Sequence, residues 1–370
     1  MVNQRPTIKM IAELSGASRG TVDRVLHKRG NVNPETARRI EETAKALHYR
    51  PNTVAKSLAT QRRNIKICVI LHIQGNLFFD DVVSGVEKAA AEIKDFGIAV
   101  TVRRGANFDV ECQLRNIDAA VHEGCRAIIL VPINDPRITT RLNDLHDTGV
   151  PVIFLTSYLE QTACLCHVGC DYYKAGRIAA ELFNLVSGGR GRIGIVTPPC
   201  TLLGVNLRIQ GLRSAIEQEY PGMRLVALSE VPGDEVLAYR YTRDMLLAHP
   251  ELDCVFYSIG GLSSGLKAIA ELDPQHKLRI VSLDMIQPIV DAVKGGMIMA
   301  TICQEPIAQG YTAIKVAFDY LLAHTEPALK NILIDPSIKI RQSFHETGIS
   351  GAVLADPDRS VDAASCVPFS

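Results

Sequence analysis

The stretch "SRGTVDRVLH", residues 18–27, combines helical apolar spacing with basic side chains close to the start of the chain. Ser18 is a favourable N-cap for a helix that would begin directly after it. The small or apolar positions at helical spacing are Thr21, Val22, Val25 and Leu26, and the polar ones among them are Arg19, Asp23, Arg24 and His27. The pattern predicts a short amphipathic helix with a basic outer face.

Two further helices are predicted, one on each side of this stretch. Thr7 would cap the first helix, and Gly16 would end it with a tight turn. Asn33 would cap the third, with Pro34 at its first helical position. The expected buried faces are Ile8, Ile11, Ala12 and Leu14 in the first helix and Ile40, Ala44 and Leu47 in the third. Three short helices with a glycine turn between the first two predict a helix-turn-helix, whose second helix lies in the DNA major groove.

Charge is unevenly distributed along the chain, although its 370 residues are neutral overall. Residues 1–63 hold 13 Lys and Arg against 5 Asp and Glu, a net charge of +8, so the remaining residues carry −8. A basic module attached to an acidic body favours a polyanion as the partner of that module over a merely solubilising terminus. We therefore expect double-stranded DNA as its partner.

Residues 7–59 resemble a known headpiece in the order of their parts. The first helix and turn are "IAELSGAS", the second helix is "TVDRVL", the third begins "VNPETARRI", and "YRPNTVAKSLA" follows. This order, without a gap, resembles the DNA-binding headpiece of the LacI family of bacterial transcription regulators. The resemblance implies an all-α headpiece that binds an operator.

The same resemblance assigns DNA-contacting positions. Arg19, Gly20 and Arg24 match base-reading positions, and since Gly20 has no side chain, the two arginines become more important for contacts with guanine. Asp23 stands where Ser is commoner in the family, and we expect it to orient Arg19 and His27, each four residues away. The implied DNA-binding set is Thr7, Ser18, Arg19, Gly20, Thr21, Arg24, His27, Asn31, Asn52, Ala55 and Leu58, in which Ser18, Thr21 and Asn31 match positions that contact phosphate or sugar.

The segment after the third helix resembles the hinge of that family. Pro51 separates it from the third helix, and Asn52 would cap a helix over residues 53–59 that is too short to be stable alone. The resemblance implies that this helix folds when two subunits meet on DNA. Leu58 would then wedge into the minor groove, and Ala55 would allow close approach. A plain linker with a buried leucine is the alternative.

From Asn64 onward, apolar runs alternate with amphipathic helical stretches. The runs are "NIKICVILHI", "IAVTVRR", "RAIILVP", "VPVIFLTS", "RIGIVT", "LDCVFYSI", "LRIVSLD", "MATICQ" and "SIKIRQSF". This alternation predicts an α/β body with parallel sheets covered on both faces. About ten strands are too many for one ordinary sheet, so two lobes with a cleft between them are expected.

The body resembles the type I periplasmic binding protein fold, especially ribose-binding-like sugar receptors, which LacI-family regulators carry as their effector domain. We therefore predict four segments. They are a headpiece over residues 1–50, a hinge and linker over 51–63, a two-lobed effector and dimerisation body over 64–345, and a mobile tail over 346–370.

Ligands of open α/β sheets bind at the carboxyl ends of strands, where polar and aromatic residues of this chain gather. The resemblance to sugar receptors implies the ligand-binding set Asn76, Phe78, Phe79, Asp135, Thr156, Tyr158, Arg208, Gly260, Asp284 and Gln304. Aromatic faces stack on sugar rings, and planar polar groups bridge vicinal hydroxyls. Taken singly, an Asp at a strand end is equally a helix cap. Thr156, Tyr158 and Gly260 depart from the receptor pattern, which leaves the sugar open.

No metal, cofactor or catalytic site is predicted. The stretch "CLCHVGC", residues 164–170, has no second ligand pair, so its cysteines are interpreted as small buried side chains. No catalytic motif is found, and the protein is interpreted as not an enzyme. There is no run of 18 apolar residues and no segment resembling a signal peptide, so we expect no membrane association and a cytoplasmic location in which the 10 cysteines stay reduced.

These observations favour a ligand-responsive transcription regulator, in the simplest case a repressor. It would bind a palindromic operator as a homodimer or tetramer, with no cofactor. A small sugar, polyol or sugar phosphate between the lobes would control it. A soluble sugar-binding receptor without a DNA role is the alternative, and the basic headpiece opposes it. An enzyme would need a nucleophile or an acid–base pair that the sequence does not offer.

Overall fold

The computed structural model describes residues 8–26, 32–47, 65–105, 108–200, 203–232, 234–259 and 263–344. Residue contacts divide the chain into a small N-terminal helical unit and a large α/β body. The predicted hinge and the predicted C-terminal tail lie outside the described residues. The predicted segment boundaries near residues 50, 63 and 345 therefore stay predictions.

The N-terminal unit contains, in its described part, α1 (Ile8–Ser15), α2 (Arg19–Leu26) and α3 (Pro34–Ala46). Local capping sets these limits as predicted. Gly16 adopts a positive φ of 63° after α1, and the Ser18 side chain accepts a hydrogen bond from the Thr21 backbone N–H at 3.1 Å. Asn33 Oδ1 accepts hydrogen bonds from two backbone N–H groups at the start of α3, where Pro34 is the first residue.

The core of this unit confirms most of the predicted apolar faces. Its buried members are Ile11, Ala12, Val22, Val25, Ile40 and Ala44, with Leu26 and Leu47 packed against them. The prediction for Leu14 is wrong, because its side chain is 66% exposed. Helical geometry places Ser15 rather than Leu14 on the face of Ile11, and the buried Ser15 Oγ donates a hydrogen bond to the Ile11 carbonyl at 2.6 Å. Thr7 and the side chain of Ile8 lie outside the described residues.

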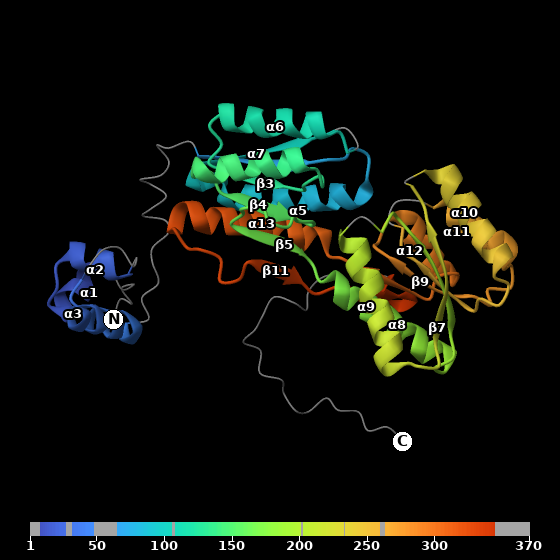
Figure 1. Cartoon of the computed structure of the whole chain (residues 1–370). Helices are drawn as coiled ribbons and strands as arrows, with labels where there is room; N and C mark the ends of the chain where they lie inside the picture. The colour runs from blue at the N-terminus through green and yellow to red at the C-terminus, as the bar shows by residue number, and fades with distance from the viewer. Residues whose placement is uncertain are drawn as a thin grey trace, which may run out of the picture. The chain divides into compact units, whose positions relative to one another are not determined.

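The body confirms the predicted two-lobed α/β fold, with one six-stranded sheet in each lobe (Figure 1). Lobe 1 contains β1 (Ile65–Leu71), β2 (Ile98–Arg104), β3 (Ala127–Leu130), β4 (Val152–Leu155), β5 (Cys166–Cys170) and β11 (Asn331–Ile334). Lobe 2 contains β6 (Arg192–Thr197), β7 (Arg224–Glu230), β8 (Cys254–Tyr257), β9 (Arg279–Leu283), β10 (Ala300–Cys303) and β12 (Ser337–Ile340). The strand orders are β11-β5-β4-β3-β1-β2 and β12-β10-β9-β8-β6-β7.

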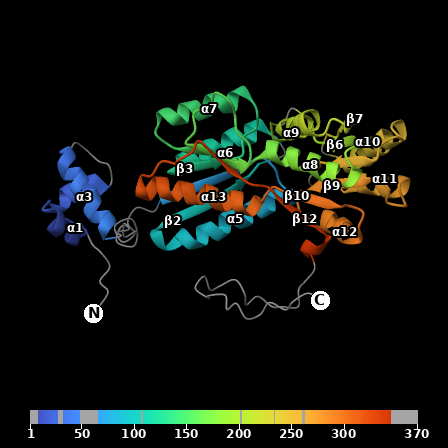
Figure 2. The ribbon, with the colours of Figure 1, turned by 90° about the horizontal axis from the view of Figure 1, so that it is seen from below.

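Helices cover both faces of each sheet, as expected for parallel strands joined by crossover helices (Figures 1 and 2). Lobe 1 has α5 (Leu77–Ile93), α6 (Val110–His122), α7 (Pro136–Asp147) and α13 (Pro306–Phe318). Lobe 2 has α8 (Tyr172–Ser187) and α9 (Leu203–Glu219) on one face and α10 (Glu235–Ala248), α11 (Ser264–Leu272) and α12 (Gln287–Gly295) on the other. Short helical turns are η1 (Lys94–Phe96), η2 (Asp319–Ala323) and η3 (Arg341–Phe344). No helix of the described chain combines the length and the apolar character needed to cross a membrane.

Two details of the sheets differ from the prediction. β5, β7 and β11 were not among the predicted runs, although β7 and β11 each contain a short apolar stretch; these two are edge strands whose residues are at most half-buried. β12 pairs antiparallel with β10, whereas parallel sheets were expected. A parallel neighbour needs a long crossover, but β12 follows β11 of the other lobe after two residues and so enters the second sheet from the opposite direction. The chain passes between the lobes after β5, after β10 and between β11 and β12.

Candidate DNA-binding and effector-binding sites

Helix α2 exposes the predicted base-reading residues on the side away from the headpiece core. Val22 and Val25 are buried, whereas Arg19, Gly20 and Arg24 are exposed. This separation follows from helical periodicity, since the two valines are three residues apart and the arginines fall on other sides of the helix. The exposed face could therefore enter a DNA groove without any change in the headpiece core.

The side chain of Arg24 lies along its own helix. Its Nε donates a hydrogen bond to the Gly20 carbonyl at 3.2 Å, and its Nη2 lies 3.5 Å from Thr21 Oγ1. Thr21 Oγ1 is in turn 2.9 Å from Ser18 Oγ. In this arrangement the guanidinium is held by weak, exposed contacts, and its role in reading bases stays a prediction.

The other predictions for the headpiece and hinge concern Asp23 and residues outside the described part of the chain. Asp23 lies within α2 and makes interactions of its own, and its orienting role stays a prediction. The residues outside the described part of the chain are Thr7, His27, Asn31, Asn52, Ala55 and Leu58. The hinge helix and its leucine wedge therefore stay predictions as well.

Three predicted ligand-binding residues of lobe 2 form one buried polar network. Gln304 Nε2 donates to both carboxylate oxygens of Asp284 at 2.8 Å, and Arg208 Nη2 donates to Gln304 Oε1 at 3.4 Å. Arg208 Nη1 also donates to Ser258 Oγ at 2.8 Å. Arg208, Asp284 and Gln304 are only 5%, 6% and 7% exposed. The network thus joins one cation, one carboxylate and an amide at a single buried point.

The fold brings these residues together at the carboxyl ends of neighbouring strands. Ser258 follows β8, Asp284 follows β9 and Gln304 follows β10, and these three strands lie side by side in the sheet. Asp284 has a positive φ of 63°, which turns the chain sharply at that point. This edge is where ligands bind in open α/β folds.

Arg208 reaches the network because α8 and α9 cross at glycines. A Cβ on Gly176 would lie 1.9 Å from the Arg208 carbonyl, and a Cβ on Gly211 would lie 2.0 Å from the Tyr173 carbonyl. Only glycine permits so close an approach of the two backbones. The crossing therefore fixes the position of Arg208 on α9.

The buried network contains a carboxyl group with a shifted pKa and, among the described residues, one donor without a partner. Burial raises the pKa of Asp284, while the Gln304 amide and the Arg208 charge act in the opposite direction. Arg208 Nε is buried without a hydrogen-bond partner among the described residues. An unsatisfied buried donor costs about 1–3 kcal/mol, so an incoming acceptor at this nitrogen would be stabilising.

Tyr172 connects this network with lobe 1. The Arg208 guanidinium lies over the Tyr172 ring, 5.6 Å from its centroid. The Tyr172 hydroxyl donates a hydrogen bond at 2.9 Å to the carbonyl of Thr156, which follows β4 of lobe 1 and has a positive φ of 60°. Tyr172 and Ser258 were not among the residues predicted from the sequence. Their position directly after a strand was the available signal, and β5, which precedes Tyr172, was not among the predicted runs.

The polar candidates of lobe 1 are engaged in helix capping. Asn76 Oδ1 accepts a hydrogen bond from the Phe78 N–H at 3.0 Å at the start of α5. Asp135 accepts from the Arg137 N–H at 2.9 Å at the start of α7 and also pairs with the Arg137 guanidinium at 3.0 Å. The hydrogen bonds from Arg137 lower the pKa of Asp135. Asp135 is therefore a helix cap in this structure, and its role as a ligand contact stays a prediction.

Aromatic rings of lobe 1 gather at the end of β1. Phe79 is 8% exposed and packs edge-on against His72, with ring centroids 5.4 Å apart, whereas Phe78 is half-buried beside it. Phe108 lies 4.5 Å from the His72 ring. Phe78 therefore keeps more accessible ring surface than Phe79 for stacking on a ligand. His72 and Phe108 were not predicted from the sequence. A single histidine directly after a strand has no sequence pattern that distinguishes it from an ordinary core residue.

The remaining candidates fall in different places. Tyr158 packs against the His167 ring at 5.0 Å within lobe 1, and Gly260 lies outside the described residues. Within the described part of the chain, no group of three His, Cys, Asp or Glu residues could hold a metal ion. Burial raises the pKa of both Cys166 and Cys170 to about 12, as for small buried thiols.

Comparisons with known proteins agree with the two-part organisation. A model of periplasmic binding protein domains matches residues 67–325, and a model of the bacterial regulatory proteins of the lacI family matches residues 7–52. The HTH-type transcriptional regulator CelR of Thermobifida fusca is 28% identical over 68% of this chain and 73% of its own length. A ribose operon repressor of Halalkalibacterium halodurans is 25% identical over 76% of this chain and 80% of its own length.

Solved structures share the fold of the body. The glucose-galactose binding protein GanP of Geobacillus stearothermophilus superposes with a TM-score of 0.69 at 21% identity, covering 76% of this chain and 99% of its own. The arabinose binding protein AraP of the same organism gives 0.67 at 23% identity, covering 75% and 97%. At these identities the likeness establishes the fold alone.

Proposed function

The chain belongs to the lacI family of bacterial regulatory proteins and carries a periplasmic binding protein domain, and from this premise we propose how its two parts act on each other. It is a ligand-responsive DNA-binding regulator. Domains of these two kinds are in general not enzymes. We propose that this protein represses transcription in the cytoplasm as a homodimer on a palindromic operator, since one headpiece covers only a half-site.

The effector that we propose is a neutral monosaccharide or polyol bound between the lobes. The observation that carries this proposal is the buried network of Arg208, Asp284 and Gln304, in which Arg208 Nε has no hydrogen-bond partner among the residues that the structure describes. A cation, a carboxylate and an amide together offer the donors and acceptors that vicinal hydroxyls require. A highly anionic ligand would meet the Asp284 carboxylate beside a single Arg, which disfavours a bisphosphate. Relatives named as ribose operon repressors support the same ligand class.

The two functions would be coupled through the arrangement of the lobes. Tyr172 and Thr156 join the lobe 2 network to lobe 1, so a ligand held by Arg208 would change the contact between the lobes. A ligand shifts DNA binding only by its differential affinity for the two arrangements. By reciprocity, operator DNA must change effector affinity by the same factor.

Calorimetry tests the effector proposal. Full-length protein is titrated with a panel of monosaccharides, polyols and their monophosphates, and with amino acids and nucleobases. We expect binding of one neutral sugar or polyol, and that compound should change the affinity of the protein for its operator in fluorescence anisotropy. Tight binding of an amino acid or nucleobase, with no response to any sugar, would contradict the proposal.

A pair of arginine variants tests the DNA half. Arg24→Ala is expected to weaken operator binding by about 1–3 kcal/mol and to relax base choice at one position. Arg38→Ala on α3 makes the same charge change at an exposed site and serves as the control. Equal losses for Arg24→Ala on operator and on random DNA would mean that Arg24 contacts phosphate only.

A further inference from the structure

The first turns of α5 in lobe 1 are held against the start of α13, because the two helices cross at glycines. A Cβ on Gly85 of α5 would lie 2.0 Å from the Ile307 carbonyl. A Cβ on Gly310 of α13 would lie 2.1 Å from the Val82 carbonyl. Any larger residue at these two positions would push the helices apart. The position of α5 is therefore fixed by the position of α13.

The start of α13 is in turn attached to the buried polar network. Gln304, which donates to Asp284, is separated by one residue from Pro306, where α13 begins. Gln309 Nε2, in the first turn of α13, donates a hydrogen bond to the Gln304 carbonyl at 2.7 Å. Contacts from α5 through α13 to Gln304 thus bring the beginning of α5 close to the network of lobe 2.

Asp81 is a half-buried carboxylate on this part of α5, four residues before Gly85. It forms no hydrogen bond or ion pair with the described residues. Burial and the neighbouring Asp80 raise its pKa, and no cation of the described chain acts in the opposite direction. Asp80 differs, because it pairs with Arg104 at 2.6 Å. Asp81 is thus a carboxylate whose charge the described residues do not compensate.

The charge of Asp81 acts on the network from the other lobe. Together with burial, it raises the pKa of Asp284. Phe78, the half-buried ring available for stacking on a ligand, precedes Asp81 by three residues and is therefore its neighbour on the helix surface. A ligand held between Phe78 and the network would come close to Asp81.

Such a ligand would meet one guanidinium and two carboxylates. The buried Arg208 Nε, which has no partner among the described residues, attracts an acceptor. An anionic acceptor would be repelled by Asp81 and Asp284 where water screens charges poorly. A hydroxyl avoids this repulsion, because it can accept from the guanidinium and donate to a carboxylate. The arrangement therefore favours neutral ligands over anionic ones.

We propose that Asp81 is a specificity-determining residue of the effector site, which excludes sugar phosphates and sugar acids and leaves the cleft to neutral sugars and polyols. This inference rests on the proposed function and assigns its preference for a neutral ligand to one residue. Arg208 alone would attract an anionic group. Asp284 offsets that attraction, and Asp81 makes the balance negative. Asp81 acts by repulsion, so it does not have to bond to the ligand.

The test compares full-length wild type with Asp81→Asn, which keeps the size of the side chain and removes its charge. Calorimetry measures each neutral sugar beside its own anionic derivatives, namely ribose with ribose 5-phosphate, and glucose with glucose 6-phosphate and gluconate. Wild type should bind a neutral sugar more than about tenfold more tightly than its derivative, and Asp81→Asn should lower this ratio about tenfold. Without ligand, Asp81→Asn should melt at or above the wild-type temperature, because Asp81 has no bond to lose.

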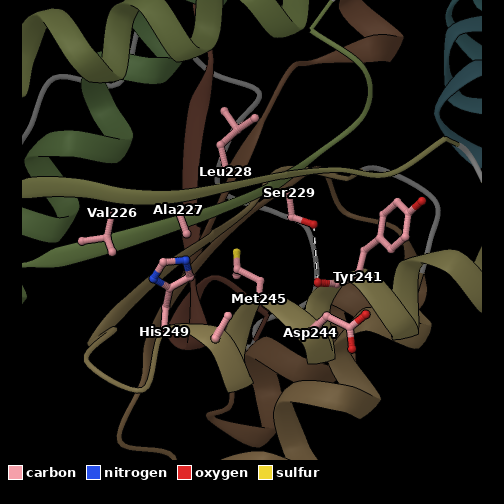
Figure 3. A pocket seen from close by; sticks show the side chains of 9 residues that line it. Val226, Ala227, Leu228, Ser229, Tyr241, Asp244, Met245 and His249 are labelled. Atoms are coloured by element: carbon pink, nitrogen blue, oxygen red, sulfur yellow. Dashed lines mark hydrogen bonds between the residues drawn. The ribbon is translucent and has the colours of Figure 1, made fainter.

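Two other carboxylates serve as controls. Glu87→Gln removes an exposed charge from the same helix. Asp244→Asn removes a charge from a groove of about 420 Å³ between β7 and α10, a second place where a small ligand could bind (Figure 3). Both variants should keep the wild-type ratio. If Asp244→Asn lowered it and Asp81→Asn did not, the ligand would lie in that groove and the inference would be overturned.

Inorganic phosphate makes the test independent of the sugar. At equal ionic strength, phosphate should raise the melting temperature of Asp81→Asn more than that of wild type or Glu87→Gln, because Arg208 then attracts it against less repulsion. Equal shifts, or an unchanged ratio in calorimetry, would overturn the inference and leave the regulator proposal intact. A wild type that prefers the anionic derivative would overturn both the inference and the neutral effector. If no sugar or polyol bound to wild type, the effector proposal would fail, and the phosphate result would decide the role of Asp81.

Discussion

The two lobes of the body have sheets of the same size and nearly the same strand order, yet their strand ends carry different chemistry. In lobe 2, Arg208, Asp284 and Gln304 bond to one another at a buried point. In lobe 1, Asn76 and Asp135 bond to backbone N–H groups that begin α5 and α7. The same residue types in the same kind of position thus form a polar site in one lobe and helix caps in the other.

This difference suggests a division of roles between the lobes. Lobe 2 offers the charged and amide groups, and lobe 1 offers rings around His72 together with the half-buried Phe78. A sugar ring has polar edges and apolar faces, and a site with one polar wall and one aromatic wall matches both. A variant showing that lobe 1 supplies the dominant polar contacts would contradict this division of roles.

The largest effect is expected for Asp284→Ala. It leaves the buried Gln304 side-chain NH₂ group without its acceptor and removes the carboxyl group near Arg208, which costs about 3 kcal/mol of unfolding free energy, and effector binding should be lost. Urea unfolding and calorimetry measure the two effects. Asp284→Asn keeps an acceptor for Gln304 and should lose less stability. If Asp284→Ala bound the effector as wild type does, lobe 2 would not be the polar wall.

The second effect is an acid sensitivity that originates in lobe 1. Burial lowers the pKa of His72 from 6.5 to about 4, so its native ring is neutral where the unfolded chain takes up a proton. The unfolded state then binds more protons between pH 6.5 and pH 4. The contribution is complete above pH 6.5, and roughly 3 kcal/mol is lost as the pH falls through this window.

His72→Gln should flatten this loss in urea unfolding at pH 7, 5 and 4. His122→Gln, at the exposed end of α6, should not change it. Asp284 in lobe 2 acts in the opposite sense, because its raised pKa means that the native state holds the proton more tightly. An unchanged pH profile in His72→Gln would place the acid-sensitive group elsewhere.

A smaller effect is expected where the lobes meet. Tyr172→Phe removes one neutral hydrogen bond to the Thr156 carbonyl, worth about 1 kcal/mol, and should weaken effector binding about fivefold. Operator binding without effector should stay the same. Tyr239→Phe removes one hydroxyl hydrogen bond, to Glu271 at the outer helices of lobe 2, and serves as the matched control. Equal behaviour of both variants would mean that Tyr172 does not connect the lobes.

The smallest effect is expected for Asp135→Asn in lobe 1. Asn caps a helix about as well as Asp, and the ion pair with Arg137 is exposed, so the urea midpoint of unfolding should stay the same as that of wild type. Effector affinity in calorimetry should stay within about twofold of wild type. A loss of tenfold or more would show that Asp135 binds the ligand and would end the contrast between the lobes.

Local features of the sequence predicted the headpiece well. Ser18, Gly16 and Asn33 set the ends of the helices through bonds within a few residues, and such interactions do not depend on distant parts of the chain. The prediction that Leu14 is buried failed because burial depends on which face the neighbouring helices cover. Ser15 occupies the buried position instead, and its hydroxyl donates a hydrogen bond to the backbone of its own helix.

Features that depend on pairing between distant segments were harder to predict. The edge strands β7 and β11 have residues that are at most half-buried, so their strand pairing is not marked by burial, and the antiparallel direction of β12 follows from its arrival from the other lobe. Tyr172 became relevant only when α8 and α9 crossed at Gly176 and Gly211 and carried Arg208 over its ring.

By itself, the sequence determined the helix-turn-helix, the basic charge of the headpiece and the two-lobed α/β body, because caps, charge and hydrophobic periodicity are local properties of the chain. The tertiary structure alone decided which of several similar strand-end residues form a site. Asp135 and Asp284 look alike in the sequence, and only the packing of α9 against α8 brings a buried cation near one of them, while a neighbouring arginine and a helix start occupy the other. Burial and the approach of distant charges are set by the whole fold.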